Sequence, residues 1–469
     1  MQIVLIGLNQ RTAPLALRER AAVGPDALPA VLTALRAHAD EALVLSTCNR
    51  VELYALAGHH ESGTEMLTRV LAATRRLDAA TIRRSSYARS HEDAVRHLHR
   101  VAAGLDSLVV GEAEVLTQVR RAAARARAAG ALGTVLGRLA ASAVSHGRRA
   151  RADAGGTHAA PSVASLALRE AERVGGPLRD KTVVVLGAGD TAARACAHVA
   201  AQRPARLVVV NRTRARAVAL AARHGAEVCA WGDRHHAAAS ADLFVACASS
   251  PEPVLEAHAL RRSRTSATRR LLCVDLSVPR VVEPAVADVP GVTLLDLGAI
   301  ETLAPRLAPV PSDAIAHAER AVELGVERFM AWWRARAVVP TVAALREHAD
   351  AVRDAELARA LARLPRLSAR EQRVVVGLAR RIVSKLMHEP TMALKEDPEG
   401  ANIAVIVRRL FALESTGDSA SRDSAPREDA SHEHAPHADT IPEHVSAHTA
   451  LVPGLSPATA SHLEEATSR

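Results

Sequence analysis

The amino-acid sequence predicts a multi-domain α/β protein that contains a doubly wound parallel sheet. Between residues 181 and 297, five strand-like apolar runs alternate with helical stretches rich in Ala and Arg, and such alternation is typical of parallel sheets. Helical periodicity dominates on both sides of this segment. The chain has 469 residues, of which 48% are hydrophobic, so it is long enough for several cores rather than one.

The pattern divides the chain into four parts. Residues 1–145 predict an α+β domain, and residues 146–300 predict a Rossmann-like domain that begins with a linking helix. Residues 305–413 predict a helical domain. Residues 414–469 are acidic and rich in His with little periodicity, which predicts a disordered tail.

The N-terminal part begins with apolar runs at 3–8, 42–46 and 51–56, which predict strands. Only a short turn separates the last two runs, and this turn carries Cys48. Loops at strand ends are where reactive groups meet substrates. From about residue 63 to 150 the spacing is helical, and in the C-terminal part Pro340 is expected to kink or break a long helix.

The first strand of the predicted parallel sheet leads into a glycine-rich turn. The five expected strands are 182–186, 207–210, 243–246, 271–274 and 292–295. The turn is Gly187-Ala188-Gly189-Asp190-Thr191-Ala192, which fits the dinucleotide-binding pattern between a strand and a helix. Gly187 allows a tight turn, Gly189 lets the backbone approach a pyrophosphate, and Ala192 lets the helix pack closely. We expect a dinucleotide here; the alternative is a glycine-rich turn without a nucleotide.

The residues after the next strand favour NADPH over NADH. A carboxylate at this position would bind a ribose 2′-hydroxyl, but the chain has Asn211, Arg212 and Thr213 instead. A guanidinium and a hydroxyl suit a 2′-phosphate. NADPH is therefore the expected cofactor.

One of the five cysteines stands apart from the others. No C-x-x-C pair occurs, which argues against a disulfide framework or a zinc site and predicts a reducing, cytoplasmic compartment. Polar residues flank Cys48, with Arg50 two residues away, either to lower the thiol pKa or to hold an anionic substrate group. The others lie in apolar contexts and are expected to be small buried side chains: Cys196, Cys229, Cys247 and Cys273.

The predicted helix around residue 97 carries two histidines. His97 lies on or beside the apolar side, as either a packed or a catalytic imidazole, whereas His99 is expected at the surface. Residues 104–112 then break the helix and are expected to expose a hydroxyl and two carboxylates. Such a loop suits the ammonium and carboxylate groups of an amino acid. The alternative is that Asp106 or Ser107 simply caps the next helix.

The charge is unevenly distributed along the chain. The net charge is +9, but residues 416–469 carry −6, so the preceding residues carry +15, the difference between the two. A basic body suits an anionic partner such as nucleic acid or a phosphorylated cofactor, or it is only a solvated Arg-rich surface. No apolar run approaches the length of a membrane span, and the first residues do not resemble a signal peptide.

Five separated motifs together resemble those of the glutamyl-tRNA reductase family, in the family's order over about residues 1–410. They are 7–14 (GLNQRTAP), 46–54 (STCNRVELY), 97–120 (HLHRVAAGLDSLVVGEAEVLTQVR), 275–280 (DLSVPR) and 385–395 (KLMHEPTMALK). The resemblance implies that the N-terminal domain is catalytic. It also implies that the helical C-terminal domain forms a homodimer.

The resemblance further implies a reaction. The Cys48 thiolate attacks the activated ester of glutamyl-tRNA(Glu), the tRNA leaves, and hydride from NADPH converts the thioester to glutamate-1-semialdehyde, the entry to tetrapyrrole synthesis. The tRNA is then the anionic partner of the basic body. A glutamate-1-semialdehyde aminotransferase is a further partner expected from the family.

Site residues follow from motif positions. The resemblance implies that Cys48 is the nucleophile, that His97 is linked to activity, and that residues 187–192 bind NADPH. Gln10 stands where the family usually has His and can alter substrate positioning, and His99 replaces a common Phe. The implied substrate-contacting residues are Thr47, Cys48, Asn49, Arg50, Ser107, Glu112, Ala113, Glu114 and Gln118.

Two other functions remain open at this point. One is a tRNA-binding or regulatory paralogue without turnover, against which the intact Cys48, Arg50 and His97 argue. The other is an NADPH dehydrogenase of a small molecule. It would need a catalytic Lys–Asp pair or a similar constellation near the cofactor, and it would leave the cysteine turn unexplained.

Overall fold

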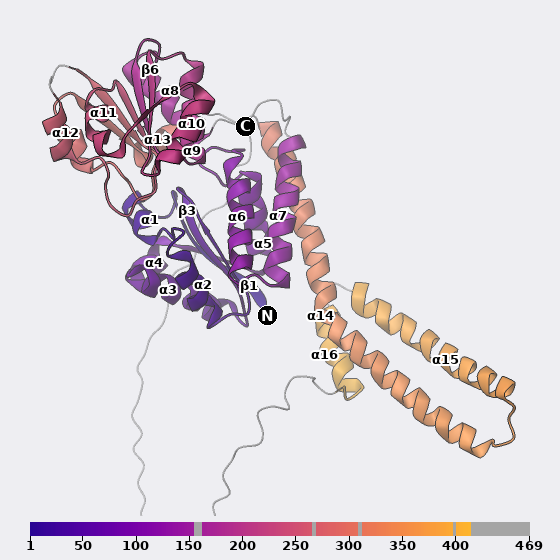
Figure 1. Cartoon of the computed structure of the whole chain (residues 1–469). Helices are drawn as coiled ribbons and strands as arrows, with labels where there is room; N and C mark the ends of the chain where they lie inside the picture. Colours follow the sequence, from indigo (N-terminus) through magenta and orange to yellow (C-terminus); the bar gives the residue numbers. More distant parts are fainter. Residues whose placement is uncertain (154–161, 265–268, 308–311, 397–399, 414–469) are drawn as a thin grey trace, which may run out of the picture. The chain divides into compact units, whose positions relative to one another are not determined.

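The computed structural model describes residues 1–153, 162–264, 269–307, 312–396 and 400–413. The tail expected at 414–469 lies outside these described residues. The described part contains a four-stranded sheet, a six-stranded sheet and several long helices (Figure 1). The predicted class, a multi-domain α/β protein with a Rossmann-like parallel sheet and a helical C-terminal part, is confirmed.

The first sheet is antiparallel, with the strand order β2-β3-β1-β4. Its strands are β1 (Gln2–Asn9), β2 (Ala42–Ser46), β3 (Arg50–Ala57) and β4 (Tyr87–Ser90). The three strands predicted from apolar runs are confirmed. The helical pattern expected from about residue 63 to 150 missed β4, because this short edge strand is only partly buried and carries no apolar run.

Seven helices surround this sheet in the described part of the N-terminal half. They are α1 (Leu15–Ala21), α2 (Leu28–Arg36), α3 (His60–Arg75), α4 (Ala79–Ser85), α5 (His91–Ala103), α6 (Glu114–Ala128) and α7 (Thr134–Asp153). Helices α5, α6 and α7 lie side by side (Figure 1). Helix α5 buries Leu98 and Val101 in the same core as β1 and β3. It ends at Gly104, whose φ of 78° is a left-handed conformation that favours glycine.

The second sheet is parallel, with the strand order β10-β9-β8-β5-β6-β7. Its strands are β5 (Thr182–Leu186), β6 (Arg206–Val210), β7 (Glu227–Cys229), β8 (Leu243–Ala246), β9 (Leu271–Asp275) and β10 (Val292–Asp296). The five predicted strands are confirmed, and only the three-residue β7 was missed. Alternate residues of β5 enter different cores, with Val183 and Val185 on one face and Val184 and Leu186 on the other.

Helices and short 3-10 turns cover both faces of the parallel sheet. They are α8 (Val163–Gly175), α9 (Asp190–Ala201), α10 (Arg214–His224), η1 (Trp231–Asp233), α11 (Arg234–Ala239), α12 (Ala257–Ser263), η2 (Pro284–Asp288) and α13 (Leu297–Leu307). After β5 the chain first adds β6 and β7 on one side, and then returns to place β8 on the other side. The carboxyl end of β5 is therefore a topological switch point, where open α/β sheets bind ligands.

The C-terminal part consists of α14 (Ser312–Arg363), α15 (Ala369–Glu396) and α16 (Gly400–Leu410). Helices α14 and α15 form a long hairpin (Figure 1). Pro340 was expected to kink or break a long helix: it does not break α14, which runs through it, and α14 changes direction near the middle of its length (Figure 1). Packing on both sides of Pro340 compensates for the lost backbone hydrogen bond. Phe329 lies in the core of the antiparallel sheet, while Val338 and Val342 pack with residues of α15 and α16.

The predicted boundary between the first two domains, after residue 145, falls inside α7. Ala150 of this helix still packs in the core of the antiparallel sheet. Among the described residues, no helix combines the length and the apolar character needed to cross a bilayer.

Candidate active site

A tight turn between β2 and β3 positions Cys48. The Thr47 amide donates to the Arg50 carbonyl oxygen at 2.8 Å, and the Thr47 hydroxyl oxygen accepts from the amides of Asn49 and Arg50 at 3.1 and 3.2 Å. A Thr side chain that binds amides two and three residues ahead stabilises such a turn. Cys48 is half-buried against the core of the parallel sheet. The structure therefore places this thiol at a turn, as expected.

The surroundings of Cys48 disfavour the thiolate in the absence of substrate. Burial raises the pKa of the thiol, and the carboxylates of Glu112 and Glu114 raise it further. Arg18 opposes this shift, and its Nη1 donates to the Cys48 carbonyl oxygen at 3.1 Å. The cation that lowers this pKa is Arg18 rather than Arg50, for which a lowered thiol pKa was one of two roles left open.

Arg50 instead belongs to a buried ion-pair network. Its Nη1 lies 2.7 Å from Glu52 Oε1 and 2.9 Å from Asp106 Oδ2. The three side chains are 2%, 0% and 7% exposed, respectively. Charges this deeply buried are tolerated only when they are paired. Arg11 reaches Asp106 from the solvent side.

Glu52 is the centre of this network and was not predicted from the sequence. Residues 50, 52 and 54 alternate along β3 and so point to one face. The Glu52 carboxylate accepts from the hydroxyls of Tyr54 at 2.7 Å and Tyr87 at 2.6 Å, and it lies 2.8 Å from His97 Nε2. Burial alone would raise the pKa of Glu52, but His97 and Arg50 hold it well below its usual range.

His97 is therefore held by a carboxylate rather than packed in an apolar core. Its side chain is 12% exposed, and its ring lies 5.2 Å from that of Tyr87. Among the described residues, no hydrogen bond joins His97 to Cys48. A carboxylate next to a histidine fixes the orientation of its ring.

The loop between α5 and α6 is compact and largely buried. The Gly111 amide donates to the Gly104 carbonyl oxygen at 3.0 Å, and a Cβ on Gly104 would lie only 3.0 Å from the Gly111 Cα. The expectation that this loop exposes its carboxylates is wrong: Asp106 is drawn inward by Arg50 and Arg11, and Glu112 is also buried. Burial and the nearby Glu114 raise the pKa of Glu112 to about 7.

Helix α6 begins without a side-chain cap. Its N-cap residue is Ala113, which is exposed and makes no capping hydrogen bond. Capping by Asp106 or Ser107, the alternative explanation for this loop, is therefore not found. Gln118 is half-buried and lines a hollow of about 130 Å³ together with Ser46, Arg121 and Arg125.

Three buried polar atoms in this region have no hydrogen-bond partner among the described residues. They are Gln10 Oε1, Asn49 Oδ1 and Ser107 Oγ. Buried polar atoms normally have a partner, so these three are candidates to bind a substrate. Gln10 joins this group although it departs from the expected histidine.

The glycine-rich turn after β5 has the geometry that a dinucleotide requires. Gly187 has a φ of 119°, and a Cβ there would lie 2.3 Å from the Cys247 carbonyl oxygen. A Cβ on Gly189 would meet no heavy atom of the described residues within 4 Å. Space is therefore open in front of the α9 N-terminus, where a pyrophosphate would be bound by unpaired amides. Ala192 is fully buried, as close helix packing needs.

The other expected cofactor residues lie at this end of the sheet. The Gly187 amide donates to the Val210 carbonyl oxygen, so the turn adjoins the segment after β6. In that segment, Arg212 and Thr213 are exposed, and the Asn211 amide group donates to the Thr213 carbonyl oxygen at 2.9 Å. Ala188 packs against the neighbouring core, while Asp190 and Thr191 begin α9, where Asp190 pairs with Arg121.

Two residue types differ in part from their expected placement. Cys196 and Cys273 are buried as expected, whereas Cys229 and Cys247 are only half-buried. The expected surface position of His99 is wrong, because its ring is fully buried between α5, α7 and α14. Its nitrogens lie 2.9 Å from the Val95 carbonyl oxygen and 3.0 Å from Ser142 Oγ.

Comparisons with known families cover most of the chain. The family model of the glutamyl-tRNAGlu reductase N-terminal domain matches residues 6–154, and that of its dimerisation domain matches residues 317–413. The family model of shikimate and quinate 5-dehydrogenase matches residues 169–303. The middle domain is thus similar to a dehydrogenase domain.

Individual relatives are similar over nearly their whole length. A glutamyl-tRNA reductase of Roseiflexus sp. (strain RS-1) is 40% identical over 89% of this chain and 98% of its own. One from Herpetosiphon aurantiacus is 37% identical over 88% and 99%. A solved structure of glutamyl-tRNA reductase from Methanopyrus kandleri is 28% identical, with a TM-score of 0.49 over 88% of this chain and 99% of its own.

Proposed function

The chain belongs to the glutamyl-tRNA reductase family of oxidoreductases, and from this premise we propose that it reduces glutamyl-tRNA(Glu) with NADPH to glutamate-1-semialdehyde. The observation that carries the proposal is the Cys48 turn, which places a thiol near the carboxylates of Glu112 and Glu114, with the Arg18 guanidinium on the Cys48 carbonyl oxygen. The product is the entry to tetrapyrrole synthesis, which is consistent with the family.

The first step is acyl transfer to Cys48. The thiolate attacks the ester carbonyl, the Sγ–C bond forms, and the C–O bond to the terminal ribose of the tRNA breaks. The leaving oxygen takes up a proton, and the glutamyl group remains as a thioester. A thioester accepts hydride far more readily than a carboxylate does, which is the reason for a covalent route.

The substrate itself supplies a charge that lowers the raised pKa of the thiol. Glu112 and Glu114 raise the pKa of Cys48, so a cation that pairs with these carboxylates lowers it. The glutamyl group of the substrate carries an α-ammonium, which suits them. Pairing with this ammonium removes the share of the two carboxylates in the raised pKa of Cys48, whereas the share of burial, its largest cause, remains.

Residues 187–192 and 211–213 are proposed to hold NADPH, with Arg212 and Thr213 at the 2′-phosphate. When bound, NADPH supplies the hydride that reduces the acyl carbon. The C–S bond then breaks, and Cys48 leaves as a thiolate. His97, oriented by Glu52 at 2.8 Å, is proposed to hold the proton that the departing ribose oxygen takes up in the first step.

The remaining proposed substrate contacts come from the Cys48 turn, from the loop before α6 and from α6. Asn49 and Ser107 carry buried polar atoms without a partner among the described residues, which supports a role in binding the substrate. Arg50, which is held by Glu52 and Asp106, is proposed to attract the substrate carboxylate by its positive charge. Thr47 holds the turn, and the remaining proposed contacts come from the loop before α6 and from α6 itself: Glu112, Ala113, Glu114 and Gln118.

A direct assay tests this function. Purified protein is mixed with glutamyl-tRNA(Glu) and NADPH, and semialdehyde is measured, with Cys48→Ser in parallel. The proposal expects product from the wild type and none from the variant. Product from both would overturn the role of Cys48. No product from the wild type, with tRNA still bound, would instead favour the non-catalytic paralogue, and turnover of free small acids would favour the small-molecule dehydrogenase.

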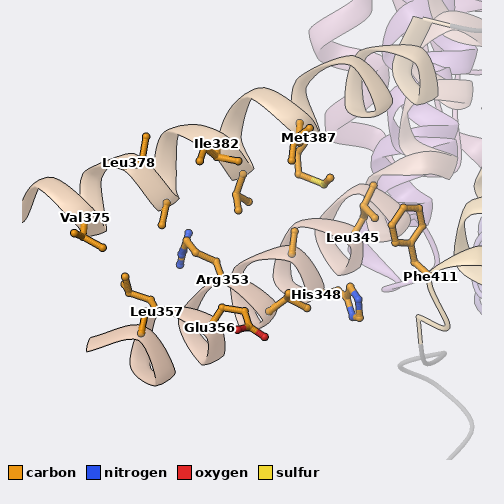
Figure 2. Close-up of a pocket in the computed structure, with 16 residues that line it drawn as sticks. Leu345, His348, Arg353, Glu356, Leu357, Val375, Leu378, Ile382, Met387 and Phe411 are labelled. Atoms are coloured by element: carbon orange, nitrogen blue, oxygen red, sulfur yellow. The ribbon is translucent and has the colours of Figure 1, made fainter. Parts of the chain in front are cut away.

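The helical C-terminal part is proposed to pair with a second copy of the chain. An apolar groove of about 550 Å³ lies between α14 and α15, and Figure 2 shows the side chains that line it. Its lining residues Val352, Leu378, Ile382 and Leu386 are between 49% and 63% exposed. Exposed apolar surface of this extent is typical of an interface. The match to a dimerisation domain over residues 317–413 supports a second copy of the chain as the partner that covers it.

Sedimentation tests the homodimer. Leu386→Glu places a charge in the groove and is expected to give a monomer, whereas Arg373→Glu, a charge change on the same helix outside the groove lining, is expected to leave the dimer intact. A wild-type monomer, or a Leu386→Glu dimer, would contradict the assignment. The aminotransferase partner and the cytoplasmic location stay predictions from the sequence.

A further inference from the structure

Helices α6 and α9 are joined by two ion pairs with a crossed arrangement. Glu114, the first residue of α6, pairs with Arg194 of α9, and Arg121 of α6 pairs with Asp190, the first residue of α9. Spacings of seven residues on α6 and four on α9 keep each helix's two charges on one face. The acidic N-terminus of each helix thus meets a base on the other helix.

For the binding of a pyrophosphate, Asp190 is an unfavourable residue at this position unless its charge is compensated. It opens α9 directly after Gly189, where open space adjoins the helix N-terminus. A pyrophosphate bound there by helix amides brings two negative charges close to the Asp190 carboxylate. An ordinary dinucleotide turn has no need of an acid at this place, and the sequence shows one.

Arg121 supplies the compensation from another segment of the chain. It extends from the third turn of α6, and its guanidinium contacts Asp190 Oδ2. Both side chains are about half exposed, at 53% and 48%. An exposed pair of this kind adds little to folding, so its effect is expected in ligand binding rather than in stability.

We propose that Arg121 is a positioning residue for NADPH: it neutralises Asp190 at the pyrophosphate turn, so that cofactor affinity depends on the contact between α6 and α9. This inference rests on the proposed function, because it requires NADPH at residues 187–192. The companion pair links the same helix contact to Glu114, a proposed substrate-binding residue. The crossed pairs therefore connect the amino-acid site with the cofactor site.

Equilibrium binding of NADPH, followed by its fluorescence at low salt, tests the proposal without turnover. We expect Arg121→Ala to weaken binding about three- to fivefold, because an exposed charge pair contributes about fivefold at most. Arg120→Ala removes an exposed arginine from the same helix and is expected to change binding less than twofold. Asp190→Asn is expected to bind NADPH at least as tightly as the wild type.

The double variant decides between charge compensation and general damage. Arg121→Ala with Asp190→Asn is expected to regain the affinity of Asp190→Asn, because no unpaired carboxylate remains. A double variant as weak as Arg121→Ala, or an Arg121→Ala affinity equal to that of Arg120→Ala, would overturn the proposal. A wild type that binds no NADPH would instead contradict the proposed function, so the two failures are distinguishable.

Discussion

The two predicted sites handle charge in opposite ways. Around β3 the charged groups are buried: Arg50, Glu52 and Asp106 are at most 7% exposed and satisfy one another. At the dinucleotide turn the charged side chains are exposed, as for Arg212 and Asp190. The charges of the first site are paired before any substrate arrives, whereas the second site offers open amides and exposed cations to an anionic ligand.

This difference has an energetic consequence. Removing one member of a buried network leaves an uncompensated charge in a medium of low polarity. Removing an exposed cation costs only its contact with the ligand, and salt screens that contact. Substitutions near β3 should therefore affect folding as well as activity, while those at the dinucleotide turn should affect cofactor binding alone.

Glu52→Gln tests the buried network around β3 and is expected to have the largest effect on stability. The variant removes the charge that faces both Arg50 and His97, so we expect the free energy of unfolding to fall by about 3 kcal/mol. Urea denaturation measures this loss. Glu65→Gln, which breaks exposed pairs with Arg69 and Arg83, should hardly change the urea midpoint. Equal midpoints for the two variants would remove the distinction between buried and exposed charge.

The buried His99 is expected to make the stability of the protein depend on pH. Burial lowers its pKa to about 4 in the folded protein, against 6.5 for an ordinary histidine. Because the unfolded chain takes up a proton first, stability falls as the pH drops from about 6.5 towards 4, and it is fully present above that window. The loss should reach about 2 kcal/mol between pH 7 and pH 5.

A variant isolates the His99 contribution. His99→Phe removes the titrating group and should flatten this part of the pH dependence of the unfolding free energy. His258→Phe replaces an exposed histidine and should leave the pH profile unchanged. A His99→Phe profile as steep as that of the wild type would assign the pH dependence to other groups.

Arg212→Ala gives the smallest expected effect and probes the exposed half. We expect NADPH affinity to fall about tenfold, the value of one charge-assisted contact, while NADH affinity stays within about twofold. Arg223→Ala, at the far end of α10, is the matched control for general charge. Equal losses for both cofactors would contradict the assignment of Arg212 to the 2′-phosphate.

Local sequence patterns predicted the elements of the molecule that are formed by consecutive residues. The β5–turn–α9 unit was predictable because strand, glycines and helix are consecutive, and the Cys48 turn because two apolar runs flank it. The three-residue β7 and the edge strand β4 were missed because neither has an apolar period long enough to detect.

Contacts between distant segments could not be read from the sequence. Arg18 was not recognised as the cation beside Cys48, 30 residues away. Glu52 looked like an ordinary strand residue, although its partner His97 lies 45 residues further on. His99 seemed exposed because α7 and α14, which cover it, come later in the chain. Such pairings depend on the tertiary fold rather than on local propensity.

Trapping the acyl-enzyme tests the central claim about Cys48 most directly. The protein is incubated with glutamyl-tRNA(Glu) in the absence of NADPH, and peptides are analysed by mass spectrometry. We predict one glutamyl group on the Cys48 peptide of the wild type and of Cys229→Ser, none in Cys48→Ser, and loss of the adduct when NADPH is added. An adduct on another residue, or semialdehyde formation by Cys48→Ser, would contradict the account.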